Sequence, residues 1–134
     1  MISKKLIGAG GNGGGIELAQ FLDVSEYVGD RPTNVVVTNT VDLSGNRGVI
    51  FLNDTGVKNE GAYLDTINGG STYLEMDSNL NELSLALLTF NTNGFTVVDT
   101  STFMNKLGSA YAGFTFRSGT KFFDVVEFTG TGSS

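Results

Sequence analysis

Short runs of apolar and β-branched residues, separated by glycine and asparagine turns, follow one another along most of the chain. Residues 34–40 are rich in valine and threonine, and residues 48–53 form an apolar run that ends in the turn sequence Asn-Asp-Thr-Gly at 53–56. Runs of this length between turn residues are typical of strands. Nineteen glycines and a single proline, Pro32, also suit short strands better than long helices. The pattern predicts an all-β protein.

The clearest local signal is a hairpin. Residues 87–90 and 95–98 are largely apolar and flank the sequence Asn-Thr-Asn-Gly at 91–94. Because an Asn-Gly pair tolerates positive φ, this sequence predicts two antiparallel strands joined by a tight turn. Upstream, Leu83, Leu85 and Leu87 recur at every second position, which favours a strand, although residues 79–90 have helical propensity as well.

Alternation also predicts a strand over residues 110–117 and gives it two faces. We expect one face to be buried and the other to point outward; the first holds Ala110, Ala112, Phe114 and Phe116, and the second holds Tyr111, Gly113, Thr115 and Arg117. Ser118 and Gly119 are expected to turn the chain into a last strand over residues 121–128. We interpret the aromatic side chains of both strands as sandwich core rather than a ligand-stacking strip: Phe114, Phe116, Phe122, Phe123 and Phe128.

One segment of the chain occurs twice. The sequence F-L-D-V-S-E-Y-V-G of residues 21–29 returns as F-F-D-V-V-E-F-T-G at 122–130, with five identical positions. A motif repeated at one domain's length suggests a tandem unit, with both copies in the same extended conformation. Coincidence between two strands of similar composition is the alternative.

Length and composition fit one domain with its own core. The chain has 134 residues, of which 40% are hydrophobic and 16% charged. We expect residues 1–20 to form a glycine-rich leader. Residues 21–134 are then one β-rich module that ends in the start of a possible second repeat.

Charge and missing residue types exclude several functions. The net charge is −6, and eight basic residues are scattered along the chain, which argues against binding to nucleic acid or to an anionic membrane. Cysteine and histidine are absent, so the chain has no disulfide, no thiolate chemistry, and neither the commonest general base nor the commonest zinc ligand. We expect no catalytic residues and no cofactor.

The leader carries the candidate interaction residues. Residues 8–15 are a low-complexity run that we predict to be a tether and to anchor the chain to another subunit through Gly8, Gly10, Gly11, Gly13, Gly14 and Gly15. The run also satisfies G-x-G-x-x-G, between a short strand-like stretch and residues 16–22, which could be helical. A dinucleotide site is the less favoured interpretation, because the later segments lack the alternating helices of a parallel sheet.

Acidic positions give no convincing metal or catalytic site. Residues 77–82 begin like a calcium-binding loop, but Glu82 stands where the sharp turn requires glycine and Leu88 where a bidentate glutamate is needed. An ordinary turn is favoured over a calcium ion held by Asp77, Asn79 and Asn81. Glu75 and Asp77 would share one strand face, where a solvated pair is the default.

The last third of the chain resembles a known family. Residues 111–130, Y-A-G-F-T-F-R-S-G-T-K-F-F-D-V-V-E-F-T-G, are similar to Y-x-x-W-T-F-R-K-x-P-K-F-F-D-V-V-x-Y-T-G, a signature of repeated domains in tailed-bacteriophage virion proteins. Residues 90–96 resemble that family's F-N-S-N-G-F-T hairpin, and looser likenesses occur at 41–51, at 64–69 and at the N-terminus. The chain departs from the signature with Phe114 in place of tryptophan and with Ser-Gly-Thr at 118–120 in place of Lys-x-Pro.

The resemblance implies a single antiparallel β-sandwich, jelly-roll or lectin-like, in a tail fibre, appendage or adaptor of the virion. The expected partners are other virion proteins and further copies of the chain, as a trimer or a ring. A capsid decoration protein (head fibre or cement) is an alternative. Another is a carbohydrate- or receptor-binding module that recognises a host surface glycan with Tyr63, Tyr73 or Tyr111 as stacking faces.

Overall fold

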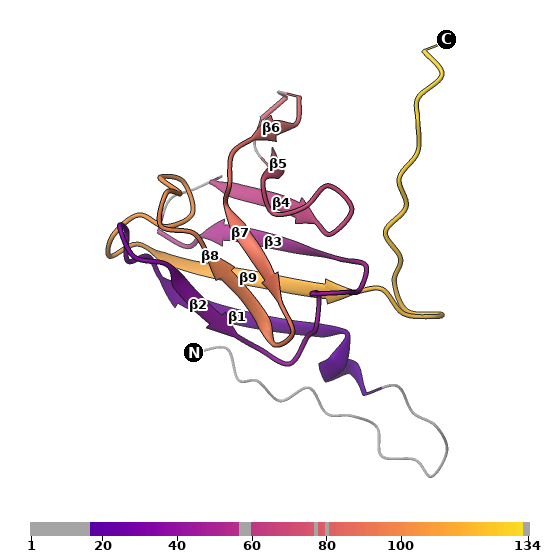
Figure 1. Cartoon of the computed structure of the whole chain (residues 1–134), viewed down its shortest axis with the longest axis horizontal. Coiled ribbons are helices and arrows are strands. Elements are labelled where there is room, and N and C mark those ends of the chain that lie inside the picture. Colours follow the sequence, from indigo (N-terminus) through magenta and orange to yellow (C-terminus); the bar gives the residue numbers. More distant parts are fainter. Residues whose placement is uncertain (1–16, 57–59, 77, 80, 133–134) are drawn as a thin grey trace.

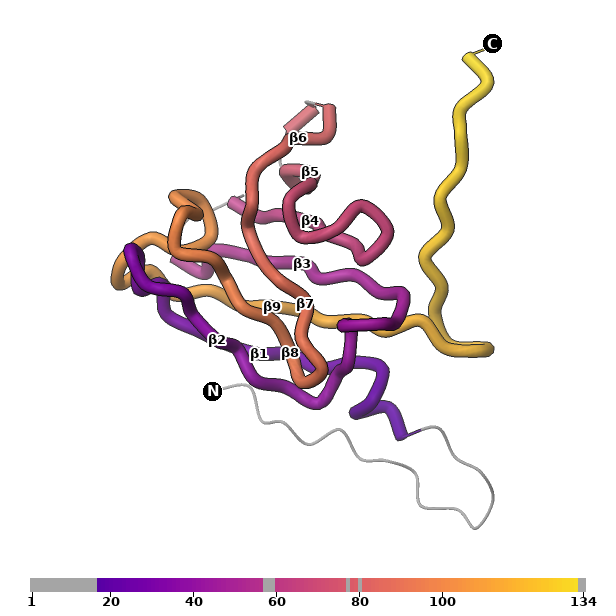
Figure 2. The backbone as a smooth tube through the Cα atoms, viewed as in Figure 1, coloured from indigo at the N-terminus to yellow at the C-terminus, as the bar shows by residue number. Residues whose placement is uncertain are grey.

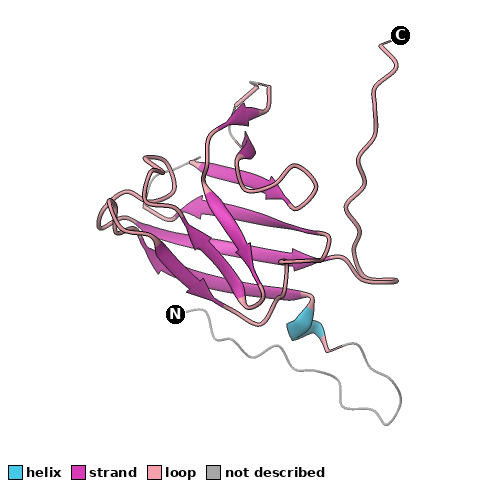
Figure 3. Ribbon diagram, viewed as in Figure 1, coloured by secondary structure: helices cyan, strands magenta, loops and turns pink. Residues whose placement is uncertain are grey.

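The computed structural model describes residues 17–56, 60–76, 78–79, 81–132. Over these residues the chain forms two antiparallel sheets and one 3-10 turn, Leu18–Gln20, and contains no α-helix (Figure 3). The smaller sheet lies across one face of the larger one, with their strands oblique to each other (Figure 1). The predicted all-β sandwich is therefore confirmed.

The larger sheet has six strands in the order β1-β9-β3-β4-β5-β6. Its strands are β1 Leu22–Val28, β9 Ala110–Arg117, β3 Gly48–Asp54, β4 Gly61–Asp65, β5 Thr72–Glu75 and β6 Leu83–Ser84. The strand predicted at 48–53 is thus confirmed as β3. The alternation at Leu83, Leu85 and Leu87 gives only the two-residue β6, after which the chain leaves the sheet.

The smaller sheet has the order β2-β8-β7, with β2 Val35–Thr38, β7 Leu88–Asn91 and β8 Gly94–Val97. The predicted hairpin is confirmed: β7 and β8 pair from Leu88↔Val97 to Asn91↔Gly94, which leaves a two-residue loop. Gly94 has φ +122, and a Cβ there would lie 2.0 Å from the carbonyl oxygen of Val37. The turn therefore requires glycine for both its conformation and its close approach to β2.

The core lies between the facing sides of the two sheets. The larger sheet contributes Ile50, Leu52, Ala62, Leu64 and Tyr111, and the smaller contributes Val37, Leu88, Phe95 and Val97. All of these side chains are buried, so the contact between the sheets is a continuous apolar layer.

The predicted faces of β9 are wrong by one residue. Tyr111 and Thr115 are 1% and 0% exposed and face the smaller sheet, whereas Phe114 is 36% exposed on the opposite face. Ala112 is buried as expected, but it lies on that same outer face. The expected outward direction of Tyr111, Gly113 and Thr115 and the expected core position of Ala110, Phe114 and Phe116 are therefore corrected.

Two close contacts explain why the small and polar face of β9 points inward. A Cβ on Gly113 would lie 2.7 Å from Cζ of Phe95, so the missing side chain is the space that the Phe95 ring fills. The Thr115 hydroxyl accepts a hydrogen bond from Nδ2 of Asn39 at 3.1 Å, which satisfies its polar atom inside the core. Each residue is thus matched to a partner in the opposite layer.

The strand predicted over residues 121–128 does not form. After β9 the chain turns, and Gly119 bridges to Phe123. Val125 is still buried, and the residues beyond it run away from the sheets without pairing (Figure 2). The edge of β9 that this segment could reach is already occupied by β1 over its full length. The two copies of the repeated motif therefore have different conformations, and Phe128 is exposed rather than part of the core.

The register of β9 can be tested with two phenylalanine truncations. We expect Phe95→Ala to lower the free energy of unfolding by about 3–5 kcal/mol, because it empties the space above Gly113. Phe114→Ala removes a ring that is already 36% exposed and should cost about 1 kcal/mol. Urea unfolding of both variants measures the difference, and a larger loss for Phe114→Ala would contradict the observed faces.

Candidate functional site

A row of apolar side chains crosses the outer face of the larger sheet, on the side away from the smaller sheet. We call it the aromatic row because its three central members are aromatic. The row takes one residue in register from each of five neighbouring strands: Val24, Phe114, Phe51, Tyr63 and Leu74. Phe114 and Leu74 are 36% and 41% exposed, and the Phe51 and Tyr63 side chains are partly buried. A sheet face normally exposed to water is here lined with apolar side chains.

The rings of this row contact one another and the first residues after β9. The Phe51 ring lies 5.2 Å from Tyr63 and 5.9 Å from Phe116, both edge to face. Phe116 in turn lies 5.6 Å from Phe123. These geometries are the favourable ones for aromatic pairs, so the outer face is an ordered surface.

The outer face changes the candidate stacking residues for a glycan. Tyr73 and Tyr111 are 7% and 1% exposed, so neither offers a free ring face, and their predicted role as stacking faces is corrected. Tyr63 keeps partial exposure and lies beside Phe51. Of the three tyrosines suggested by the sequence, Tyr63 alone has a position suited to stacking.

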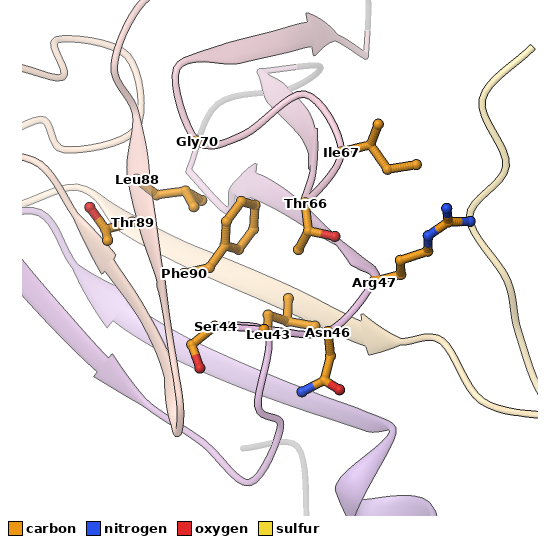
Figure 4. A pocket seen from close by; sticks show the side chains of 11 residues that line it. Leu43, Ser44, Asn46, Arg47, Thr66, Ile67, Gly70, Leu88, Thr89 and Phe90 are labelled. Carbon is orange, nitrogen blue, oxygen red and sulfur yellow. The ribbon is translucent and has the colours of Figure 1, made fainter.

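An open pocket of about 560 Å³ lies at one end of the sandwich, between the loop before β3, the β4–β5 turn and strand β7. In Figure 4 the Phe90 ring points into the opening, and the side chain of Arg47 points out of it toward the C-terminal segment. Arg47 donates a hydrogen bond from a guanidinium nitrogen to the carbonyl oxygen of Val125 at 3.4 Å. Its charge is therefore directed to the protein's own backbone rather than to the pocket.

The pocket lining offers hydroxyl and amide groups but no carboxylate; its polar side chains are Ser44, Asn46, Arg47, Thr66 and Thr89. Nearby, the Ser44 hydroxyl and N–H both donate to Asp42, and these bonds hold the pKa of that carboxyl below its usual range. A general acid needs a raised carboxyl pKa, so Asp42 is not prepared for that role. The arrangement suits polar binding better than acid–base chemistry.

The most strongly shifted ionisable side chain of the described part of the chain is Tyr27, which has a structural role. The Tyr27 hydroxyl donates to the carbonyl oxygen of Met104 at 2.9 Å, and its ring stacks on Tyr111 at 5.0 Å. Burial, followed by the nearby Tyr111 and Asp54, raises the pKa of Tyr27 far above its ordinary value. Burial likewise raises the pKa of Tyr63, Tyr73 and Tyr111.

These shifts predict loss of stability at high pH. Because the folded state favours the neutral phenol of Tyr27, its contribution is fully present below the unfolded pKa of 10.0 and is lost as the pH rises above it. We expect the unfolding midpoint to fall steeply above about pH 10. Thermal melts between neutral and strongly alkaline pH measure this loss. In Tyr27→Phe the alkaline fall should be smaller, and an equal fall would contradict the assignment.

Several predicted site residues lie outside the described residues. These are the leader glycines Gly8, Gly10, Gly11, Gly13, Gly14 and Gly15, and Asp77 of the calcium-loop alternative and of the Glu75–Asp77 pair. The described end of the leader bears on the dinucleotide alternative: residues 18–20 form a single 3-10 turn and β1 begins at Leu22. The helix that this alternative needs over 16–22 is therefore not formed in residues 17–22.

The described residues contain neither a cluster of metal ligands nor a membrane-spanning helix. No group of three acidic residues there is placed to hold a metal ion. No helix there is both long and apolar enough to cross a membrane.

The outer aromatic row was missed by sequence reasoning, because β4 and β5 were not recognised as strands and β9 was assigned the opposite faces. Part of a signal was present, because Phe51 and Tyr63 each lie between two apolar residues, and the structure buries those neighbours.

Comparison of the chain with protein-family models, with curated proteins and with solved structures finds no match. The fold and surfaces define the class of protein: a two-layer antiparallel β-sandwich with an apolar row across its outer face.

Proposed function

We propose that the protein is a non-catalytic structural component of a tailed-bacteriophage virion, a tail-fibre, appendage or adaptor module anchored by its N-terminal segment. The support is the resemblance of residues 90–96 and 111–130 to repeated domains of virion proteins. The two segments meet in the core, where Phe95 fills the space over Gly113. Of the residues shared with that family, Phe95, Tyr111 and Thr115 are buried between the two sheets. Shared residues therefore contribute to the packing of the sandwich, which is the role expected of a structural module.

The surfaces agree with a function in assembly. The partly exposed aromatic row gives the sandwich a second apolar face, and such faces are typical of contacts with other proteins. In the proposal, copies of the chain form a trimer or a ring, and residues 1–20 contact a neighbouring subunit.

A glycan- or receptor-binding role is the second candidate, and the position of Tyr63 beside Phe51 favours it. Binding of the isolated protein to a glycan array, lost in Tyr63→Ala and kept in the buried control Tyr73→Phe, would support this role over a purely structural one.

The location of the chain in a particle tests the main proposal. We expect antibody–gold labelling of tailed particles to mark the tail or its appendages, and mass spectrometry of purified particles to detect the chain. Label on the capsid would support the decoration alternative. Absence of the chain from purified particles, with abundant soluble protein in the lysate, would refute a virion function.

The anchoring role predicts the effect of a deletion. Without residues 2–15 the sandwich should keep its circular dichroism spectrum and thermal midpoint, because the described core lies within residues 22–125. The truncated chain should nevertheless fail to enter particles. The full-length chain expressed at the same level is the control, and normal incorporation of the truncated chain would overturn the anchor.

A further inference from the structure

Strand β1 occupies one edge of β9 in a defined register. The pairing runs from Leu22↔Phe116 to Val28↔Ala110 and is bounded by two backbone hydrogen bonds. Arg117 N–H donates to the carbonyl oxygen of Phe21 at 2.8 Å, and Gly29 N–H donates to that of Ser109 at 2.9 Å. The space along this edge therefore accepts nine residues, from 21 to 29.

This position is selective for particular residues. A Cβ on Gly29 would lie 2.1 Å from the carbonyl oxygen of Lys106, so the last position must be glycine. Asp23 accepts hydrogen bonds from the N–H of Thr40 at 3.1 Å and of Val24 at 2.8 Å. The C-terminal copy of the motif keeps both residue types, as Gly130 and Asp124.

The C-terminal copy also has exposed apolar residues at positions that are buried in β1. Ser25 and Tyr27 of β1 point into the sandwich and are 4% and 8% exposed. Their counterparts, Val126 and Phe128, are 71% and 87% exposed. The C-terminal copy thus has apolar side chains at the two positions that point into the core in β1. Its sequence suits the place of β1, which it does not occupy in this structure.

The connection to β9 permits the same register. If Phe123 paired with Phe116 as Leu22 does, Phe122 would stand opposite Arg117, and residues 118–121 would form a four-residue hairpin loop, a common length. The two segments already begin side by side: the Phe122 ring lies 5.7 Å from Phe21, and Phe123 lies 5.6 Å from Phe116. Figure 1 shows both at the end of β9 from which the C-terminal segment departs.

We propose that the edge of β9 is a shared binding site for two strands of the same chain, so that residues 122–130 can replace β1 by folding back as a hairpin. The replacement releases the N-terminal segment through Val28. This inference concerns the fold of the single chain, goes beyond the proposed virion function and does not depend on it.

The balance between the two strands has contributions of both signs. Val126 would replace Ser25, whose buried hydroxyl has no hydrogen-bond partner among the described residues. Phe128 would replace Tyr27 and lose the bond to Met104. The C-terminal segment would also give up present contacts: the burial of Val125, the Arg47–Val125 hydrogen bond, and the Ser118 hydroxyl donating to Asp124 at 2.5 Å. No single contribution fixes the edge to one strand.

Disulfide trapping tests the exchange, since the natural chain contains no cysteine. Val28 of β1 pairs with Ala110 of β9, and Thr129 is the counterpart of Val28 in the C-terminal copy. In Ala110→Cys/Thr129→Cys, mild oxidation of the full chain should give a crosslinked monomer. Ala110→Cys/Val28→Cys should crosslink as well, because it traps the structure seen here. In Leu107→Cys/Thr129→Cys, an exposed residue near β9 replaces residue 110, and crosslinking should be much slower.

Two further variants make the test decisive. Adding Tyr27→Phe should raise the 110–129 crosslinked fraction about three- to tenfold, the range expected for loss of one hydrogen bond that holds β1. Adding Phe128→Asp should abolish that crosslink and leave the 28–110 crosslink unchanged. The proposal is overturned if the 110–129 pair forms no crosslink under conditions in which the 28–110 pair crosslinks fully, if the 107–129 control crosslinks equally fast, or if the 110–129 product is a covalent dimer.

Discussion

The contact between the Phe95 ring and the bare backbone of Gly113 determines how closely the two sheets approach. Phe95 comes from β8 in the centre of the smaller sheet, and β9, which carries Gly113, lies between β1 and β3 in the larger one. Tyr27 and Tyr111 flank this contact, and their hydroxyls bond to the backbone of the loop after β8, at Met104 and Phe103. Any side chain at position 113 would push the layers apart and weaken these buried hydrogen bonds with them.

The sequence was sufficient for the fold class and for local turns, and insufficient for the faces of strands. The hairpin at 91–94 was predictable because asparagine and glycine determine a turn by themselves. Both faces of β9 are apolar enough to be buried. Because phenylalanine is more hydrophobic than Gly113 and Thr115, the face with the phenylalanines was expected to be the buried one. What decides the direction is a partner elsewhere in the fold: the Phe95 ring over Gly113 and the Asn39 amide on Thr115. Neither partner is visible from residues 110–117.

The same limit explains the last segment and the candidate site. Residues 122–130 have a strand-like sequence, yet a strand needs an unoccupied neighbour, and β1 already holds the edge of β9. Tyr73 and Tyr111 were expected to be exposed rings, but the fold buries both. Tyr63 instead belongs to the aromatic row, to which five strands contribute. Such a row depends on register between strands distant in sequence, which no local pattern encodes.

The stacked tyrosines have an optical consequence. The chain has no tryptophan, so tyrosines dominate its near-ultraviolet absorption, and Tyr27 and Tyr111 lie almost parallel, with ring centres 5.0 Å apart. Identical chromophores held this close share their excited states, which gives a circular dichroism signal that isolated tyrosines lack. One ring belongs to β1 and the other to β9. The molecule therefore carries an intrinsic spectroscopic label for the strand at its edge, readable without a dye or an isotope.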